Sequence, residues 1–95
     1  MAIYVYILQS ERDNSYYKGY SENPLLRLDY HNNGQSNYTS KKTPWKLVCV
    51  LGFETKAAAL VAEKKLKKYP VKSLLAVINS DKNILSHYLK RFENR

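Results

Sequence analysis

The sequence predicts an α+β fold in which a small, mainly antiparallel sheet of three strands is flanked by helices. Two segments rich in β-branched and aromatic residues, 3–9 and 16–21, lie close together near the start of the chain. A third such segment, 45–53, lies between two segments with helical signals. The expected order is therefore ββαβα, followed by a helical tail.

The first two strands are expected to form a hairpin. The segment between them contains Asp13 and Asn14, two residues that tolerate turn conformations, and a short turn joins antiparallel strands. Because side chains alternate along a strand, Tyr4 and Tyr6 should share one face of the sheet. The other face should carry the aliphatic residues of the same strand, namely Ile3, Val5 and Ile7.

The first helix is expected to begin at Asn23 and Pro24, because asparagine caps helices and proline suits the first helical position. It should end at Gly34, which tolerates a left-handed conformation. Residues 34–44 are polar and predict a loop before the third strand.

A long helix is expected over residues 55–69, capped by its first residue, a threonine, and terminated by the proline that follows it. Its alanine-rich first half has high helix propensity. Residues 71–79 and 82–92 predict two shorter helices, the second capped by Ser80 and Asp81.

The 95 residues predict one domain, 1–95, with a core over 3–69 and a helical extension over 70–95. The single cysteine, Cys49, excludes an internal disulfide and a zinc site made of several thiolates. Because Cys49 lies in an apolar run, we expect it to be buried and inert. The N-terminus has no signal-peptide pattern and no apolar stretch approaches the roughly 20 residues needed to span a bilayer, so we expect a soluble, cytoplasmic protein that does not contact membranes.

The net charge of +8 is concentrated in one part of the sequence. Residues 41–72 carry nine lysines against two glutamates, whereas residues 1–40 are slightly acidic. Such a segment attracts polyphosphate at long range, which favours nucleic acid as a partner. The alternative is that the charge serves only to keep the protein soluble.

Two tripeptides carry a resemblance to a known family. Tyr4-Val5-Tyr6 on the first strand and Tyr17-Lys18-Gly19 on the second resemble the paired tripeptides of the GIY-YIG nuclease superfamily, with Tyr4 in place of glycine and Lys18 in place of isoleucine. Arg27 and His31 on the next helix, then Glu63 on the later one, follow in the family's order. The resemblance covers residues 3–69 and is closest to short stand-alone members, through Tyr4-Val5-Tyr6-Ile7-Leu8, His31-Asn32-Asn33-Gly34, Tyr38-Thr39 and Glu63-Lys64-Lys65-Leu66-Lys67-Lys68.

The resemblance implies a GIY-YIG fold and an endonuclease that hydrolyses DNA phosphodiesters with Mg²⁺ or Mn²⁺. It assigns the metal to Glu63, a phosphate-binding role to Arg27 and the water-activating base to Tyr6, with Tyr17 and His31 orienting the base. His31 is a rival base, because an unperturbed histidine titrates near neutral pH. These groups supply a nucleophile, charge stabilisation and help for the leaving oxygen.

Each residue also has a purely structural interpretation. Tyr6 and Tyr17 could be ordinary sheet aromatics, and His31 could pack near the helix end. The charged residues could form ion pairs, Arg27 with Glu22 or Asp29, and Glu63 with Lys67 four residues on.

Six residues are candidates for contact with nucleic acid: Lys18, Tyr38, Lys41, Lys42, Lys64 and Lys67. The lysines would attract phosphates, and Tyr38 would stack on a base. Trp45 is expected to be a core or edge anchor rather than a platform for base stacking. Because the sequence has no evident element for reading bases, DNA that is structured or damaged is the expected substrate, with DNA favoured over RNA. The alternatives are a non-catalytic nucleic-acid-binding module with the same fold and a protein-interaction domain.

Overall fold

The computed structural model describes residues 2–93 and has the predicted α+β architecture. The elements are β1 (Ile3–Ser10), β2 (Tyr16–Ser21), α1 (Pro24–Asn32), the 3₁₀ helix η1 (Ser40–Lys42), β3 (Trp45–Phe53), α2 (Lys56–Lys67), α3 (Val71–Ile78) and α4 (Leu85–Glu93). The first residue and the last two residues of the predicted domain lie outside the described residues. None of the helices that the structure describes has the length and apolar character needed to cross a membrane.

The sheet has the strand order β2-β1-β3, and both pairs are antiparallel. Strand β1 is therefore central, and β2 forms one edge. Tyr6 on β1 lies opposite Gly19 on β2, and Leu8 lies opposite Tyr17. This register places Tyr6 and Tyr17 on the same face, because paired residues point the same way.

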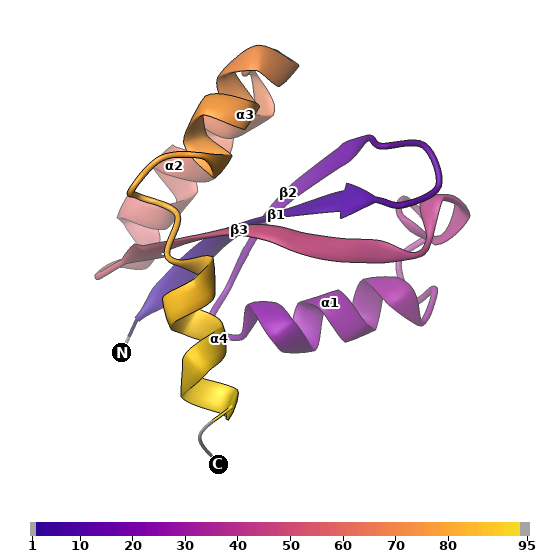
Figure 1. Cartoon of the computed structure of the whole chain (residues 1–95), viewed down its shortest axis with the longest axis horizontal. Helices are drawn as coiled ribbons and strands as arrows, with labels where there is room; N and C mark the ends of the chain where they lie inside the picture. Colours follow the sequence, from indigo (N-terminus) through magenta and orange to yellow (C-terminus); the bar gives the residue numbers. More distant parts are fainter. Residues whose placement is uncertain (1, 94–95) are drawn as a thin grey trace.

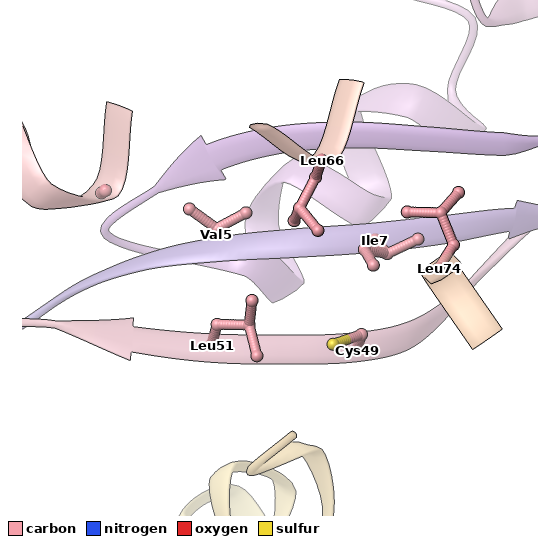
Figure 2. Close-up of a cluster of buried hydrophobic side chains, with 7 residues drawn as sticks. Val5, Ile7, Cys49, Leu51, Leu66 and Leu74 are labelled. Atoms are coloured by element: carbon pink, nitrogen blue, oxygen red, sulfur yellow. The ribbon is translucent and has the colours of Figure 1, made fainter. Parts of the chain in front are cut away.

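One face of the sheet is covered by α2 and α3, which lie on the opposite side from α1 and α4 (Figure 1). Figure 2 shows the core on this face, where Leu66 of α2 and Leu74 of α3 point toward side chains of β1 and β3. Those strand residues are Val5, Ile7, Cys49 and Leu51. The predicted aliphatic face is confirmed. Burial raises the pKa of the Cys49 thiol to about 12, which agrees with an inert structural thiol.

The other face carries the aromatic residues of β1, as predicted, and packs against α1 and α4. Tyr88 of α4 lies edge-on to Tyr4, with 5.2 Å between ring centroids. Trp45 is 4% exposed, and its Nε1 donates a hydrogen bond of 3.0 Å to the carbonyl oxygen of Thr39. The prediction that Trp45 anchors the core is confirmed.

The predicted starts of α1 and α2 are confirmed by their caps. The Asn23 Oδ1 accepts a hydrogen bond of 3.2 Å from the amide of Leu26, and the Thr55 Oγ1 accepts one of 3.1 Å from Ala58. Gly34 has a φ of +71°, the left-handed conformation expected after α1. Helix α2 ends at Lys67 rather than residue 69, because the residue before a proline disfavours helical dihedrals.

The predicted cap of the last helix at Ser80 and Asp81 is wrong. Helix α4 begins at Leu85, whose amide donates 3.0 Å to Asn83 Oδ1, while Ser80 Oγ instead donates to a carbonyl of α3. Asn83 also accepts from the amide of Val50 at 3.0 Å, and Ile84 N donates to the Val50 carbonyl at 2.9 Å. The chain before α4 is therefore fastened to the outer edge of β3, and this tertiary contact sets where the helix starts.

Candidate active site at the sheet edge

A cavity of about 360 Å³ brings together four of the residues predicted to form a site. Its lining consists of Tyr6 from β1, Tyr17, Gly19 and Tyr20 from β2, Arg27 from α1 and Glu63 from α2. Helices α1 and α2 pack on opposite faces of the sheet, so their side chains can meet only at an edge. The short edge strand β2 allows this meeting.

Tyr6 reaches the edge because Gly19 lets its ring pass over β2. A Cβ atom at Gly19 would lie 2.6 Å from Tyr6 Oη and 2.8 Å from Tyr6 Cζ, which is closer than such atoms can approach. Sequence reasoning identified this glycine only as part of a tripeptide and missed its role. Its position opposite a tyrosine in the hairpin register was the available signal.

His31 lies behind Tyr6 rather than in the cavity. Its Nε2 is 3.2 Å from Tyr6 Oη, and its Nδ1 is 2.9 Å from Thr39 Oγ1. His31 is 1% exposed, and burial, reinforced by the charge of Arg27, lowers the pKa of His31 to about 4. The imidazole is therefore neutral at pH 7. Thr39 is also fully buried, and its contact with His31 was not predicted.

The rings of Tyr6 and Tyr17 lie 6.3 Å apart, centroid to centroid. Burial raises the pKa of both hydroxyls, and the nearby guanidinium of Arg27 opposes this rise. Burial alone would lower the pKa of Arg27, but its contact with Tyr6 raises it. Arg27 is therefore a fixed positive charge next to two protonated tyrosines.

Arg27 stacks on an aromatic ring of its own helix. Its Cζ lies 4.1 Å from the centroid of Tyr30. The two ion pairs found within residues 2–93 do not include Arg27, so the predicted alternative pairing with Glu22 or Asp29 is not observed. The stacking orients the guanidinium and leaves its donors available to the cavity.

Glu63 reaches the cavity from α2 with a side chain that is 14% exposed. Its Oε1 lies 3.7 Å from Lys67 Nζ, so the predicted i,i+4 ion pair is present. The ion pair and a position on the cavity wall are compatible, because residues four apart share one face of a helix.

A metal ion in this cavity would have one protein carboxylate. Within the described residues, no group of three or more His, Cys, Asp or Glu side chains could hold a metal ion. Zinc sites need three or four protein ligands, and this donor set does not fit them. Mg²⁺ retains several waters and is bound through one or two carboxylates and substrate phosphates. Glu63 fits a hard cation of this kind.

A second depression of about 450 Å³ adjoins the first, and Tyr17 lines both. Its other lining residues are Tyr16, Lys18, Tyr38 and Lys67. Three of the six predicted nucleic-acid contacts therefore lie together. Burial and the charge of Lys67 lower the pKa of Lys18.

The other three predicted contacts lie elsewhere. Lys42 pairs with Asp13 in the β1–β2 turn, at 3.6 Å between Nζ and Oδ2. The backbone oxygen of its neighbour Lys41 accepts a hydrogen bond from Arg12. Lys64 is exposed on α2 and lines neither depression. Lysines that are close in the sequence therefore do not all lie on one surface of the protein.

Comparison with known proteins identifies similar chains. The family model described as the GIY-YIG catalytic domain matches residues 2–71. The UPF0213 protein spr1390 of Streptococcus pneumoniae is 41% identical over 88 residues, which cover 90% of this chain and 88% of that protein. The structure-specific endonuclease subunit SLX1 of Phaeosphaeria nodorum is 42% identical over 65 residues, which cover 61% of this chain but 18% of that protein.

A solved structure has the same fold. The solution NMR structure of the UPF0213 protein BH0048 from Bacillus halodurans superimposes with a TM-score of 0.56 at 29% sequence identity. The match covers 86% of this chain and 87% of that one. The similarity therefore extends beyond the strands to most of the helices.

Proposed function

Because the chain belongs to the GIY-YIG catalytic domain family, a family of nucleases, we propose that it is a divalent-metal-dependent endonuclease that hydrolyses phosphodiester bonds in DNA. The observation that carries this proposal is the meeting of Tyr6, Tyr17, Arg27 and Glu63 in one cavity. The name of one similar protein, a structure-specific endonuclease subunit, supports structured DNA as the substrate. We place this activity in the cytoplasm.

Arg27 is the group that binds the scissile phosphate. Its planar guanidinium can donate two hydrogen bonds to the non-bridging oxygens, and its position against Tyr30 fixes their direction. The same charge stabilises the negative charge that builds up on these oxygens as water attacks. Hydrolysis forms a bond between phosphorus and the water oxygen and breaks the bond between phosphorus and the leaving sugar oxygen. One proton of the water must be removed, and the leaving oxygen takes a proton from solvent to become a hydroxyl.

Tyr6 and Tyr17 orient the attacking water, and Tyr6 is the acceptor of its proton. When Nδ1–H of His31 donates to Thr39, Nε2 can accept a hydrogen bond from the Tyr6 hydroxyl, which fixes the direction of the Tyr6 oxygen. To act as the base, Tyr6 loses its hydroxyl proton to solvent, and the phenolate, stabilised by Arg27, accepts the proton of the water. His31 contacts no substrate in this scheme and serves as a positioning residue.

Glu63 is the residue that would hold Mg²⁺ or Mn²⁺, and the bound ion would polarise the phosphate and lower the pKa of a coordinated water. The low exposure of the Glu63 side chain limits the directions in which its oxygens can point.

Glu63→Gln tests this proposal. The substitution is nearly isosteric and removes only a partly exposed ion pair, so the fold and the DNA affinity in EDTA should be unchanged. Cleavage of plasmid and branched oligonucleotides with Mg²⁺ or Mn²⁺ should fall by roughly 100-fold or more, because a catalytic metal contributes several kcal/mol. The control is Glu54→Gln, at an exposed acid outside the cavity, which should retain full activity.

Two results would count against the proposal. Full activity of Glu63→Gln would refute the assignment of the metal ligand. If the unaltered protein bound DNA but cleaved none of these substrates with either metal, the non-catalytic binding module would be the correct function.

A further inference from the structure

The depression beside the proposed active site has the composition of a site for an unpaired nucleotide. Its charged groups are the ammonium ions of Lys18 and Lys67, the second of which also pairs with Glu63, and its walls are tyrosine rings. Proteins that bind single strands combine such positive charges, which hold the phosphates, with aromatic rings on which bases stack.

The side chain of Tyr38 lies largely in solvent and is not part of the hydrophobic core. Its side chain is 78% exposed, although the next residue, Thr39, is fully buried. Thr39 is fixed through its hydroxyl to His31 and through its carbonyl oxygen to Trp45 Nε1. The backbone at Tyr38 is thus anchored while its ring faces solvent. An exposed ring on an anchored backbone has a free face for stacking, and little conformational entropy is lost when it binds.

The location of Tyr38 relates this ring to the scissile phosphate. Its ring centroid is 6.1 Å from that of Tyr17, which lines both depressions. The buried chain from Thr39 through His31 to Tyr6 connects the same loop to the proposed base. A nucleotide on Tyr38 would therefore be adjacent to the one whose phosphate lies at Arg27.

We propose that this depression binds an unpaired nucleotide next to the scissile phosphate, with its base stacked on Tyr38 and its phosphate between Lys18 and Lys67. A base in a duplex is already stacked on both sides and has no face to offer this ring. The preferred substrate is then DNA with an unpaired nucleotide at the cleavage point, such as a flap or a single strand. This inference rests on the proposed function for the cleavage but not for the binding.

The test measures binding and cleavage separately. A single-stranded oligonucleotide with 2-aminopurine at one position is titrated with protein in EDTA, and stacking on Tyr38 should quench its fluorescence. Tyr38→Ala should abolish the quenching and weaken binding by roughly 5- to 100-fold, the range for one lost base–aromatic stack. Tyr38→Phe should retain both, because it keeps the ring. Tyr69→Ala, at another exposed tyrosine that lines neither depression, is the control.

Cleavage supplies the second measurement. With Mg²⁺, replacing the base beside the cleaved bond by an abasic site should reduce cleavage by the unaltered protein to the level of Tyr38→Ala. Quenching and affinity that are equal in Tyr38→Ala and the unaltered protein would overturn the inference, even if both proteins cleave DNA. Quenching that depends on Tyr38 without any cleavage would support the site and refute the proposed function.

Discussion

Gly19→Ala perturbs the proposed active site by the addition of one methyl group. The new Cβ would lie 2.6 Å from Tyr6 Oη and 3.1 Å from Tyr17 Cε2, so both tyrosines are affected. The backbone imposes no further penalty, since Gly34 is the only described glycine with a positive φ. The first of these distances must grow to at least 3.4 Å for an ordinary contact. Tyr6 is 1% exposed and is hydrogen-bonded to His31, so a movement of its ring disturbs buried contacts.

The expected cost follows from this displacement. Overpacking of a buried site costs about 1–3 kcal/mol, and the hydrogen bond between Tyr6 and His31, already 3.2 Å long, would contribute about 1 kcal/mol more if it broke. Urea unfolding should therefore show a loss of roughly 2–4 kcal/mol. Displacement of the proposed base by about 1 Å should reduce cleavage by about 100-fold.

Gly52→Ala is a matched control for this change. Gly52 lies on β3 opposite Tyr4 of β1, just as Gly19 lies on β2 opposite Tyr6. A Cβ at Gly52 would meet only ordinary contacts, of which the nearest is 3.5 Å from Ile84 Cδ1. This variant should be neutral or more stable by up to about 1 kcal/mol and fully active. If Gly19→Ala matched Gly52→Ala in stability and single-turnover rate, the account of how Tyr6 reaches the edge would be wrong.

Two other predictions concern the groups behind the site and the tail. The pKa of His31 is about 4 in the folded protein against an ordinary value of 6.5, so the unfolded state binds its proton first as the pH falls. The free energy of unfolding should therefore decrease by about 3 kcal/mol between pH 6.5 and 4. Urea unfolding of His31→Asn should lose most of this pH dependence. The control variant His87→Asn, at an exposed histidine, should keep the pH dependence. Asn83→Ala removes a hydrogen-bond partner from two amides, those of Val50 and Leu85, and from two carbonyl groups, and it should destabilise the protein by roughly 2–4 kcal/mol. A loss below about 0.5 kcal/mol would show that the tail is not fastened through Asn83.

Local signals account for most of the fold that could be predicted. The alternation around Tyr4 and Tyr6 fixed the two faces of β1, and the side chains of Asn23 and Thr55 marked helix starts through bonds to amides three residues on. Asn83 was missed because its partners on β3 are distant in the sequence. A cap that depends on a tertiary contact leaves no local pattern in the sequence. Ser80 and Asp81 did form a local capping pattern, but α4 does not begin there.

The candidate site divides in the same way. The resemblance to the GIY-YIG family, through Tyr6, Tyr17, Arg27 and Glu63, predicted which residues would meet. The sequence could not predict that Thr39 would be buried against His31, because that depends on how the loop folds over α1. The lysines of α2 show a second limit of prediction from sequence, because neighbours in the chain can face different sides of a helix.

Glu63 and Lys67 share a face of α2, and Glu63 lines the cavity while Lys67 lines the depression beside it. Lys64 is rotated by about 100° from Glu63 around the helix and lines neither. A count of charges in a segment therefore overestimates the surface that a ligand can use. Of the lysines that the structure describes, Lys18 and Lys67 face the sheet edge and line the depression beside the cavity.

The two edges of the sheet have different roles. The outer edge of β3 is occupied, because Val50 is hydrogen-bonded through both its amide and its carbonyl to the segment before α4. The outer edge of β2 pairs with no strand of the described chain, and the proposed active site lies there. An open edge invites pairing with another copy, and charged side chains on a short strand oppose such pairing.

Strand β2 is six residues long and carries Lys18, and the net charge of +8 repels other copies. The same positive charges attract a phosphate backbone. Charges that oppose pairing with a second copy therefore also favour the approach of nucleic acid to this edge, where Tyr6 and Glu63, from opposite faces of the sheet, meet.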